Sequence, residues 1–299
     1  MPSTRGYIKV NFVIFNYSTK DSSQPMYLHE EINKIPDCQC IMVNGGTENL
    51  YYVYDRTLPD IVIMNIGTDM RNVIHYNQNS AKKVKHIINI DLVEDKHIPL
   101  IKEILNQKEI NCPLAFSSNI NHKKEDFGIP YEHVLQCAND KIEKSDIDFK
   151  IDKAIIINKK EDKKEYSGSY HFLSNAPEDV GADSNLNPFS MAGILHNYHE
   201  IIFRNIKPNL IPESFFNAIM LSNSKVYFDN DNKEEAIALQ SSLSKMLDDE
   251  TMFDFNQAKI YNEDKVRLKI GDRHKPRNRL KQIFSQIKET HVFLEGMEK

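Results

Sequence analysis

The residues best suited to bind a charged ligand lie in one stretch of the chain, NIKPNLIPESFFNAIMLSNSKVYFDND, from Asn205 to Asp231. Arg204 and Lys207 place two positive charges between a predicted strand and a predicted helix that begins near Ile211–Ser214. The first turn of a helix leaves backbone N–H groups unsatisfied and carries the positive end of the helix dipole. Such a helix start, with two cations beside it, could hold a phosphate group.

The same stretch also fits a purely structural role. Pro212 suits a first helical turn, where its missing N–H is not needed, and Glu213 suits the dipole with or without a ligand. Phe215, Phe216 and Ile219 form an apolar face that could pack on a sheet. From these residues alone, a scaffold and a ligand site are equally well supported.

Two loops of the first half are candidate sources of a catalytic base. The turn NGGTEN, Asn44–Asn49, contains Glu48, and the turn GTDM contains Asp69. Both turns follow predicted strands, and ligands of α/β proteins bind beyond the carboxyl ends of strands. Either carboxylate could instead cap the helix that follows it.

The chain lacks the sequence motifs of several common enzyme classes. The chain contains no GxGxxG fingerprint, no GxxxxGK[ST] phosphate loop and no GxSxG elbow, so we predict no tightly held NAD or FAD and no serine hydrolase site. His196 and His199 lack the spacing of a zinc-protease helix. The four cysteines lack the spacing of a zinc site, and reduced, buried thiols are the better interpretation. We therefore predict no metal and no bound cofactor.

Composition narrows the class of protein. The 299 residues include 40% hydrophobic and 27% charged residues, and the formal net charge is −5. This charge disfavours a globally basic nucleic-acid-binding protein without excluding a local basic patch. No apolar run approaches the ~18 residues of a membrane span, and no signal peptide is evident. We predict a cytoplasmic protein without a transmembrane segment.

The first half alternates predicted strands and helices. The strands are short and rich in Val, Ile and Phe, and several are almost continuously apolar, as in a sheet covered on both faces. This alternation predicts a doubly wound parallel sheet. The predicted strands are Tyr7–Phe15, Cys38–Val43, Asp60–Ile66, Lys85–Ile90 and Pro113–Ser118, and the predicted helices are Met26–Ile35, Met70–Asn79 and His97–Gln107.

The second half repeats this pattern after a polar linker, Asn139–Lys153. We predict two domains, residues 1–145 and 150–299. The second has predicted strands at Lys153–Asn158, Tyr170–Ser174, His199–Asn205 and Lys225–Asp229, and predicted helices at Met191–Tyr198, Ile211–Ser222, Glu234–Leu247, Glu250–Tyr261 and Pro276–Lys288.

Residues 190–290 resemble the C-terminal domain of GT-B glycosyltransferases, closest to the CgeB-like or group 1 type. The resemblance rests on a proline-initiated helix, a turn of small residues and a strand that ends in aspartate. The matching residues are Pro212, Phe216, Ala218, Ser222–Ser224 and Asp229. It implies two Rossmann-like domains facing a central cleft, with a helical C-terminal tail that returns to the first domain.

The resemblance further implies transfer of a sugar from a nucleotide-sugar donor to a glycan or other acceptor, without a metal. The implied donor-binding residues are Arg204, Asn205, Lys207, Glu213, Ser214 and Asn217, and the candidate bases are Glu48 and Asp69. The family's acidic residue that meets the ribose is Asn217 here, and Asn223 stands for its usual glycine.

Three alternatives remain open. A non-catalytic GT-B-like binding protein would explain Asn217. A phage-type transferase that modifies DNA bases would need a basic stripe, which the segment GDRHKPRNRLK could supply through Arg273, Lys275, Arg277, Arg279 and Lys281. A sugar epimerase would share the doubly wound fold.

Overall fold

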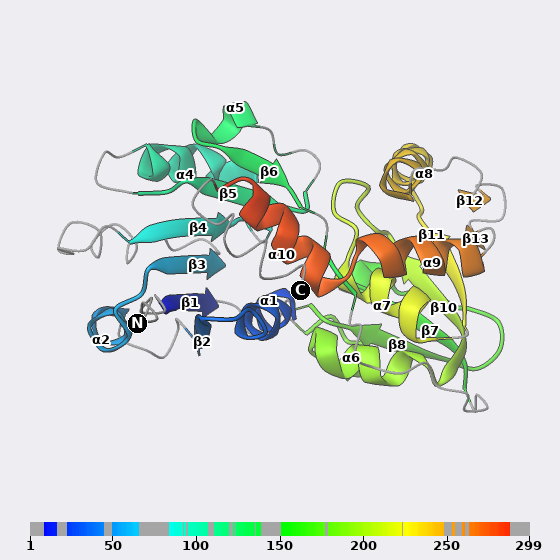
Figure 1. Cartoon of the computed structure of the whole chain (residues 1–299). Coiled ribbons are helices and arrows are strands. Elements are labelled where there is room, and N and C mark those ends of the chain that lie inside the picture. The colour runs from blue at the N-terminus through cyan, green and yellow to red at the C-terminus, as the bar shows by residue number, and fades with distance from the viewer. Residues whose placement is uncertain are drawn as a thin grey trace, which may run out of the picture. The chain divides into compact units, whose positions relative to one another are not determined.

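The computed structural model describes residues 9–16, 23–44, 50–65, 84–91, 93, 95–106, 111–119, 122, 124–134, 136–138, 151–176, 179–222, 224–247, 253–254, 259–260 and 263–287. The chain forms two compact units (Figure 1). The first comprises residues 1–19, 24–134 and 279–299, and the second comprises residues 20–23 and 135–278. The last segment of the chain thus belongs to the first unit.

The first unit is an α/β fold around a parallel sheet of order β2-β1-β3-β4-β5-β6. Its strands are β1 (Val10–Asn16), β2 (Cys38–Asn44), β3 (Ile61–Asn65), β4 (Lys85–Asn89), β5 (Leu114–Ser117) and β6 (Tyr131–His133). Its helices are α1 (Gln24–Asn33), α2 (Leu50–Thr57), η1 (Asp95–His97), α4 (Ile98–Leu105), α5 (Lys124–Phe127) and α10 (Pro276–Ser285).

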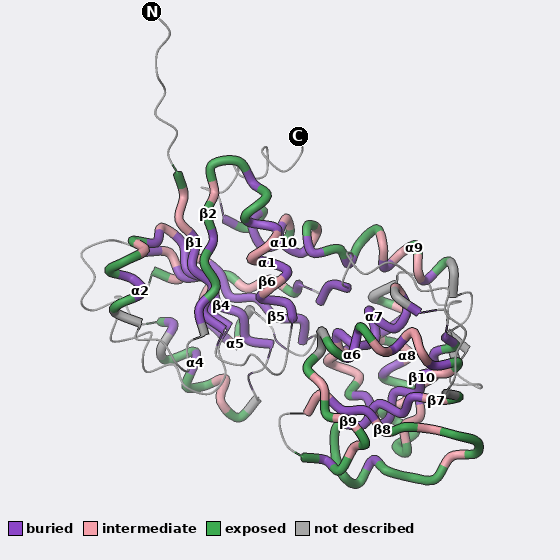
Figure 2. The backbone as a smooth tube through the Cα atoms, turned by 90° about the horizontal axis from the view of Figure 1, so that it is seen from below, coloured by how far each residue is buried: buried purple, intermediate pink, exposed green. Residues whose placement is uncertain are grey.

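Helices cover both faces of this sheet. One face packs on α2, α4 and α5, through residues such as Tyr54, Ile101 and Phe127. The other packs on α1 and on α10, where the ring of Phe284 stacks on that of Phe12 at 5.7 Å. The nearly continuous apolar strands are therefore buried on both sides, as the sequence predicts (Figure 2).

The second unit is built around a seven-stranded sheet of order β12-β13-β11-β10-β7-β8-β9, in which the five strands β7 to β11 are parallel. The strands are β7 (Ile151–Ile156), β8 (Tyr170–Ser174), β9 (Ser184–Asn185), β10 (Tyr198–Arg204), β11 (Lys225–Asp229), β12 (Phe253–Asp254) and β13 (Lys259–Ile260). The helices are η2 (Lys160–Asp162), α6 (Pro188–Leu195), α7 (Glu213–Leu221), α8 (Lys233–Leu247) and α9 (Glu263–Arg273).

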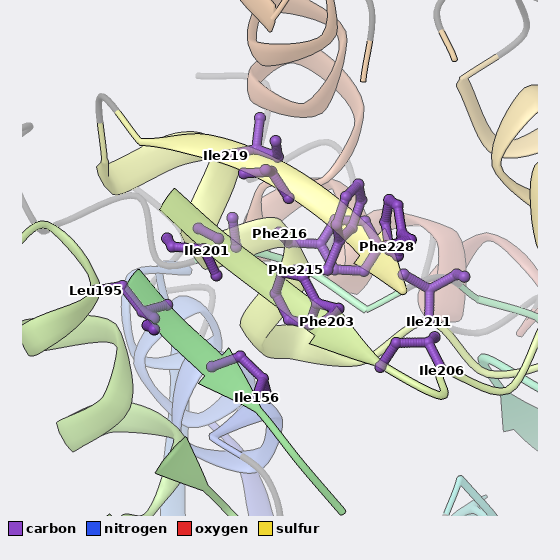
Figure 3. Packing of buried hydrophobic residues seen from close by; sticks show 14 of the residues in the cluster. Ile156, Leu195, Ile201, Phe203, Ile206, Ile211, Phe215, Phe216, Ile219 and Phe228 are labelled. Atoms are coloured by element: carbon purple, nitrogen blue, oxygen red, sulfur yellow. The ribbon is translucent and has the colours of Figure 1, made fainter. Parts of the chain in front are cut away.

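One face of the second sheet carries the helices of this unit. Helices α6, α7, α8 and α9 contribute to the larger core, in which aromatic rings of β10, β11 and α7 meet. The rings of Phe215 and Phe228 lie 5.5 Å apart, and those of Phe203 and Phe228 lie 5.9 Å apart (Figure 3). The opposite face is covered, in the described residues, by loop residues such as Tyr166 and Ala176. This unit is thus Rossmann-like in strand order, with loops in place of helices on one face.

One predicted element differs from the structure, and the prediction does not include every helix. The predicted helix Glu250–Tyr261 is wrong where residues are described, because Phe253–Asp254 and Lys259–Ile260 form the antiparallel pair β12–β13. The helix α9 is absent from the prediction because its buried face is narrow, with Val266 and Ile270 as its apolar core residues. The predicted helix Met70–Asn79 lies outside the described residues.

Candidate functional site

The strand order of the second unit points to one edge of its sheet as the candidate site. The five parallel strands run in the order β9-β8-β7-β10-β11, so the chain moves outward in one direction from β7 and in the other from β10. Ligands of open α/β sheets bind beyond the carboxyl ends of the strands at such a reversal. Strands β7 and β10 end here at Ile156 and Arg204.

Arg204 lies at this edge, but its side chain is directed into the protein and is only 2% exposed. Its Nε donates to the carbonyl oxygen of Asp162 at 3.1 Å. Its Nη1 donates to the carbonyl oxygen of Asp229 at 2.9 Å, and its Nη2 donates to the carboxylate of Asp231. The guanidinium therefore links the end of β10 to the carbonyl of Asp162 and to the end of β11. Its positive charge is paired with a carboxylate of the protein itself.

Asp229, the last residue of β11, accepts two further contacts from the loop after β7. The hydroxyl of Tyr166 donates to Asp229 Oδ2 at 2.6 Å, and Lys164 Nζ lies 2.6 Å from the same oxygen. Burial, together with this hydrogen bond, raises the pKa of Tyr166 above its ordinary value, so the phenol is a neutral donor. The loop after β7 is thereby held against the end of β11.

Asn205 completes the network from an unusual backbone conformation. Its φ of 47° is in the left-handed region, which asparagine tolerates better than most residues. Its Nδ2 donates to Asp162 Oδ1 at 2.7 Å, and its Oδ1 accepts from the backbone N–H of Asp231 at 2.9 Å. This side chain therefore ties the end of β10 to both neighbouring loops.

The charges of this network do not favour an anion. Three carboxylates, those of Asp162, Asp229 and Asp231, meet two cations, Arg204 and Lys164. The hydrogen bond from Arg204 holds the pKa of Asp231 below its usual range, and the Asp231 side chain is 63% exposed. An ionised carboxylate is thus available at this edge to accept hydrogen bonds from hydroxyl groups.

The predicted residues of α7 are buried at the start of the helix. Glu213 Oε2 accepts the backbone N–H of Ser23 at 3.0 Å, and its Oε1 lies 3.5 Å from Nδ2 of Asn217. Ser214 Oγ is also buried, and it has no hydrogen-bond partner among the described residues. The N-cap residue Pro212 provides no side-chain cap.

The structure thus joins Arg204 and Asn205 in one network at the end of β10, buries the start of α7 separately, and leaves Lys207 exposed in the connecting loop. It does not place the two predicted bases, because Glu48 and Asp69 lie outside the described residues. The sequence did not suggest Asp162, Lys164 or Tyr166 as site residues. Their loop contains acidic and basic residues in balance and carries no local signal of a site, because its contacts with β10 and β11 reach across more than 40 residues.

The basic segment near the C-terminus does not form one stripe. Arg279 is buried, and its Nη2 donates to Asp91 Oδ2 at 3.1 Å, whereas Lys275 and Arg277 are exposed. The prediction that Arg279 could contribute to a DNA-binding surface is therefore wrong. The buried guanidinium serves instead to attach α10 to the first unit.

Comparisons with known proteins do not identify a family. No protein-family model matches the chain, and no curated protein sequence does. Within the described ranges, no cluster of three His, Cys, Asp or Glu side chains has the arrangement of a metal site. In the same part of the chain, no helix has the length and apolar character needed to cross a membrane.

Proposed function

We propose that this chain is a glycosyltransferase of the GT-B type that uses a nucleotide-sugar donor, and that the second unit binds the donor. One observation carries the proposal. The reversal of strand order lies between β7 and β10, and the loop that follows β10 leads directly into α7, the helix that carries the GT-B-like pattern. In α/β folds, nucleotides bind at such a reversal.

The arrangement of the chain's end also supports the proposal. From Arg279 onward the chain belongs to the first unit, and Leu280, Ile283 and Phe284 are part of that unit's core. The GT-B resemblance implies a terminal helix that returns in this way. Two α/β units, one with a parallel sheet and one with five parallel strands in a mixed sheet, agree with the same architecture.

The contacts support different roles for the predicted donor-binding residues. Lys207 is exposed and is the cation suited to the diphosphate, whereas Arg204 positions the neighbouring carboxylates. Asp231 and Asn205 could accept hydroxyl groups of the ribose or the sugar. Lys207 near the leaving diphosphate would supply positive charge in place of a metal ion, and the acceptor hydroxyl would be activated by a base such as Glu48 or Asp69.

A specific observation favours a second candidate, a non-catalytic binding protein of the same fold. Asn217, which replaces the family's acidic residue, is completely buried. Its Nδ2 lies 3.5 Å from Glu213, whose other oxygen already accepts from Ser23. Neither side chain is therefore positioned at the surface to receive a ribose, and a protein that has lost its donor site would show this arrangement.

The test is a thermal-shift and calorimetry panel of UDP-, GDP-, ADP- and CMP-sugars with the whole chain. We expect one nucleotide class to raise Tm, and Lys207→Ala to weaken its binding by roughly tenfold, the value of a charge-assisted hydrogen bond. Lys225→Ala is the matched control, because Lys225 is exposed at the opposite end of the same sheet. An assay of donor hydrolysis or sugar transfer then distinguishes an enzyme from a non-catalytic binding protein. The absence of any shift would reject donor binding altogether.

A further inference from the structure

Four neighbouring strands of the first sheet end in asparagine at the same level. The parallel register pairs Asn16 of β1 with Asn44 of β2 and with Asn65 of β3, and it pairs Asn65 with Asn89 of β4. Figure 1 shows the arrowheads of β1, β3 and β4 pointing the same way. The alternation of side chains along a strand places residues of equal register on the same face of the sheet. Asn16, Asn65 and Asn89 therefore form a row, which we call the asparagine row.

Two amides of this row, those of Asn65 and Asn89, are buried and use only part of their hydrogen-bonding capacity. Asn65 and Asn89 are 5% and 6% exposed. Asn89 Nδ2 donates to Asn65 Oδ1 at 2.8 Å, Asn65 Nδ2 donates to the carbonyl oxygen of Phe15 at 3.3 Å, and Asn89 Oδ1 accepts from the N–H of Asp91 at 3.0 Å. A carboxamide has two N–H donors and two lone pairs. Asn65 and Asn89 thus each keep one donor and one lone pair for a further partner.

The row lies where an α/β sheet of this order binds its ligand. The order β2-β1-β3-β4 reverses direction between β1 and β3, and Asn16 and Asn65 are the last residues of those two strands. Binding at the carboxyl edge beside such a reversal is the general rule for these folds. Each side-chain nitrogen and oxygen of Asn65 and Asn89 already has one hydrogen-bond partner, and the second donor and lone pair of each amide can bond a ligand without breaking these contacts. These observations are independent, and both indicate a ligand at this edge.

The charges at this edge indicate which ligand. Among the described residues that end or follow β1, β3, β4 and β5, Asp91 is the carboxylate, and it pairs with Arg279 at 3.1 Å. Its other oxygen accepts from the hydroxyl of Ser118 at 2.9 Å. The ion pair is neutral as a whole and is internally bonded. In the described part of this edge, Arg279 is engaged with Asp91 and does not offer its charge to an anionic ligand, whereas a group that both donates and accepts hydrogen bonds matches the amides of Asn65 and Asn89.

We propose that the asparagine row binds an uncharged, polyhydroxylated ligand, a neutral glycan. Each sugar hydroxyl can donate to the free lone pair of one amide and accept from the N–H of the next. That this glycan is the acceptor of the transfer reaction rests on the proposed function. The binding itself rests on the register, burial and hydrogen bonds of the first unit.

The experiment screens the whole chain against an array of neutral, sialylated and sulfated glycans and measures the best binder by calorimetry. We expect a neutral oligosaccharide to bind, and Asn65→Ala and Asn89→Ala each to weaken it by at least about tenfold, the effect of one lost hydrogen bond in a buried site. Asn111→Ala is the matched control, since this asparagine is exposed in the same unit. Circular dichroism and Tm verify folding, and Asn65→Ser and Asn89→Ser replace any alanine variant that does not fold.

Three results would overturn the inference: no neutral glycan binds, charged glycans bind in preference, or folded variants at both positions keep the wild-type affinity. The nucleotide-sugar panel on the same preparation separates the two proposals. Donor binding without glycan binding rejects the asparagine-row site alone. Glycan binding that depends on Asn65 and Asn89, with no response to any nucleotide sugar, rejects the transferase alone.

Discussion

Asp91 and Arg279 form a buried ion pair across 188 residues of sequence, with Nη2 and Oδ2 3.1 Å apart. Both side chains are at most 5% exposed, and the guanidinium also lies over the ring of Phe116 at 5.5 Å. The pair joins α10 to the carboxyl edge of the first sheet. Its partners are so well enclosed that removing one would leave an uncompensated charge in the core.

We therefore expect Arg279→Met to lower the free energy of unfolding by about 3–5 kcal/mol, the usual cost of breaking a buried pair from one side. Denaturant unfolding measures this loss, with Arg277→Met as the control, because Arg277 is exposed on the same helix. The double variant Arg279→Met, Asp91→Asn should recover part of the loss. A change of less than about 0.5 kcal/mol in the single variant, as for surface residues, would contradict the role of the pair.

Arg204 and Lys207 should respond differently to alanine substitution, although the sequence suggested the same phosphate-binding role for both. Arg204→Ala leaves Asp229 and Asp231 without their shared cation, so we expect a loss of at least about 2 kcal/mol, reduced from the buried-pair value because Asp231 is exposed. Lys207→Ala should leave Tm unchanged and weaken nucleotide binding. Thermal melting of both variants with and without nucleotide checks this, and equal melting temperatures would contradict the structural role of Arg204.

We expect His86 to make the first unit sensitive to acid. It is fully buried on β4, and its Nε2 lies 3.0 Å from the hydroxyl of Tyr54. Burial lowers the pKa of His86 to about 4, against the smaller opposing effect of the carbonyls of Asn111 and Val84. Between pH 6.5 and 4 the unfolded chain binds a proton at this residue and the folded chain does not. Stability therefore falls as the pH falls through this window, by roughly 3 kcal/mol at its lower end.

His86→Gln keeps a hydrogen-bonding group near Tyr54 but cannot be protonated. We expect the variant to lose less stability than the wild type between pH 6.5 and 4, measured by denaturant unfolding at each pH. His171→Gln, at an exposed histidine of the second unit, should follow the wild-type profile. Parallel profiles for His86→Gln and the wild type would show that His86 does not cause the acid sensitivity.

Asn33 protects the edge of the first sheet. Strand β2 is the last strand on its side, and Asn33 pairs with the backbone of Cys40 as a neighbouring strand would. Its Oδ1 accepts from Cys40 N–H at 2.9 Å, and its Nδ2 donates to the Cys40 carbonyl at 3.1 Å. Ile41 and Met42 next to it are 37% and 41% exposed. An open edge beside exposed apolar residues promotes association between chains.

Asn33→Ala should therefore increase aggregation on mild heating, measured by light scattering at a fixed protein concentration. Asn33→Asp keeps the acceptor for Cys40 N–H and loses the donor, so we expect it to aggregate to an intermediate extent. Asn106→Ala provides the same substitution away from the edge. Equal scattering from Asn33→Ala and the wild type would remove this protective role.

The sequence predicted strands more reliably than side-chain roles. Buried parallel strands are short apolar runs, and Tyr170–Ser174 and Lys225–Asp229 have the predicted bounds. The helix Leu50–Thr57 gave no signal because its aromatic and β-branched residues favour strands as much as helices. The position of Arg204 at a strand end was predictable, but its burial was not. Its partner Asp229 lies 25 residues away, and no local pattern encodes that contact.

The return of α10 to the first unit has a consequence for synthesis of the chain. The face of the first sheet that contains Phe12 needs Leu280, Ile283 and Phe284 to complete its core. These residues leave the ribosome about 150 residues after Val134, roughly 8–30 s later at 5–20 residues per second. The second unit can fold during that interval. The first unit must wait with this sheet face covered by α1 alone among the described helices, so the nascent chain is expected to need chaperone protection until α10 emerges.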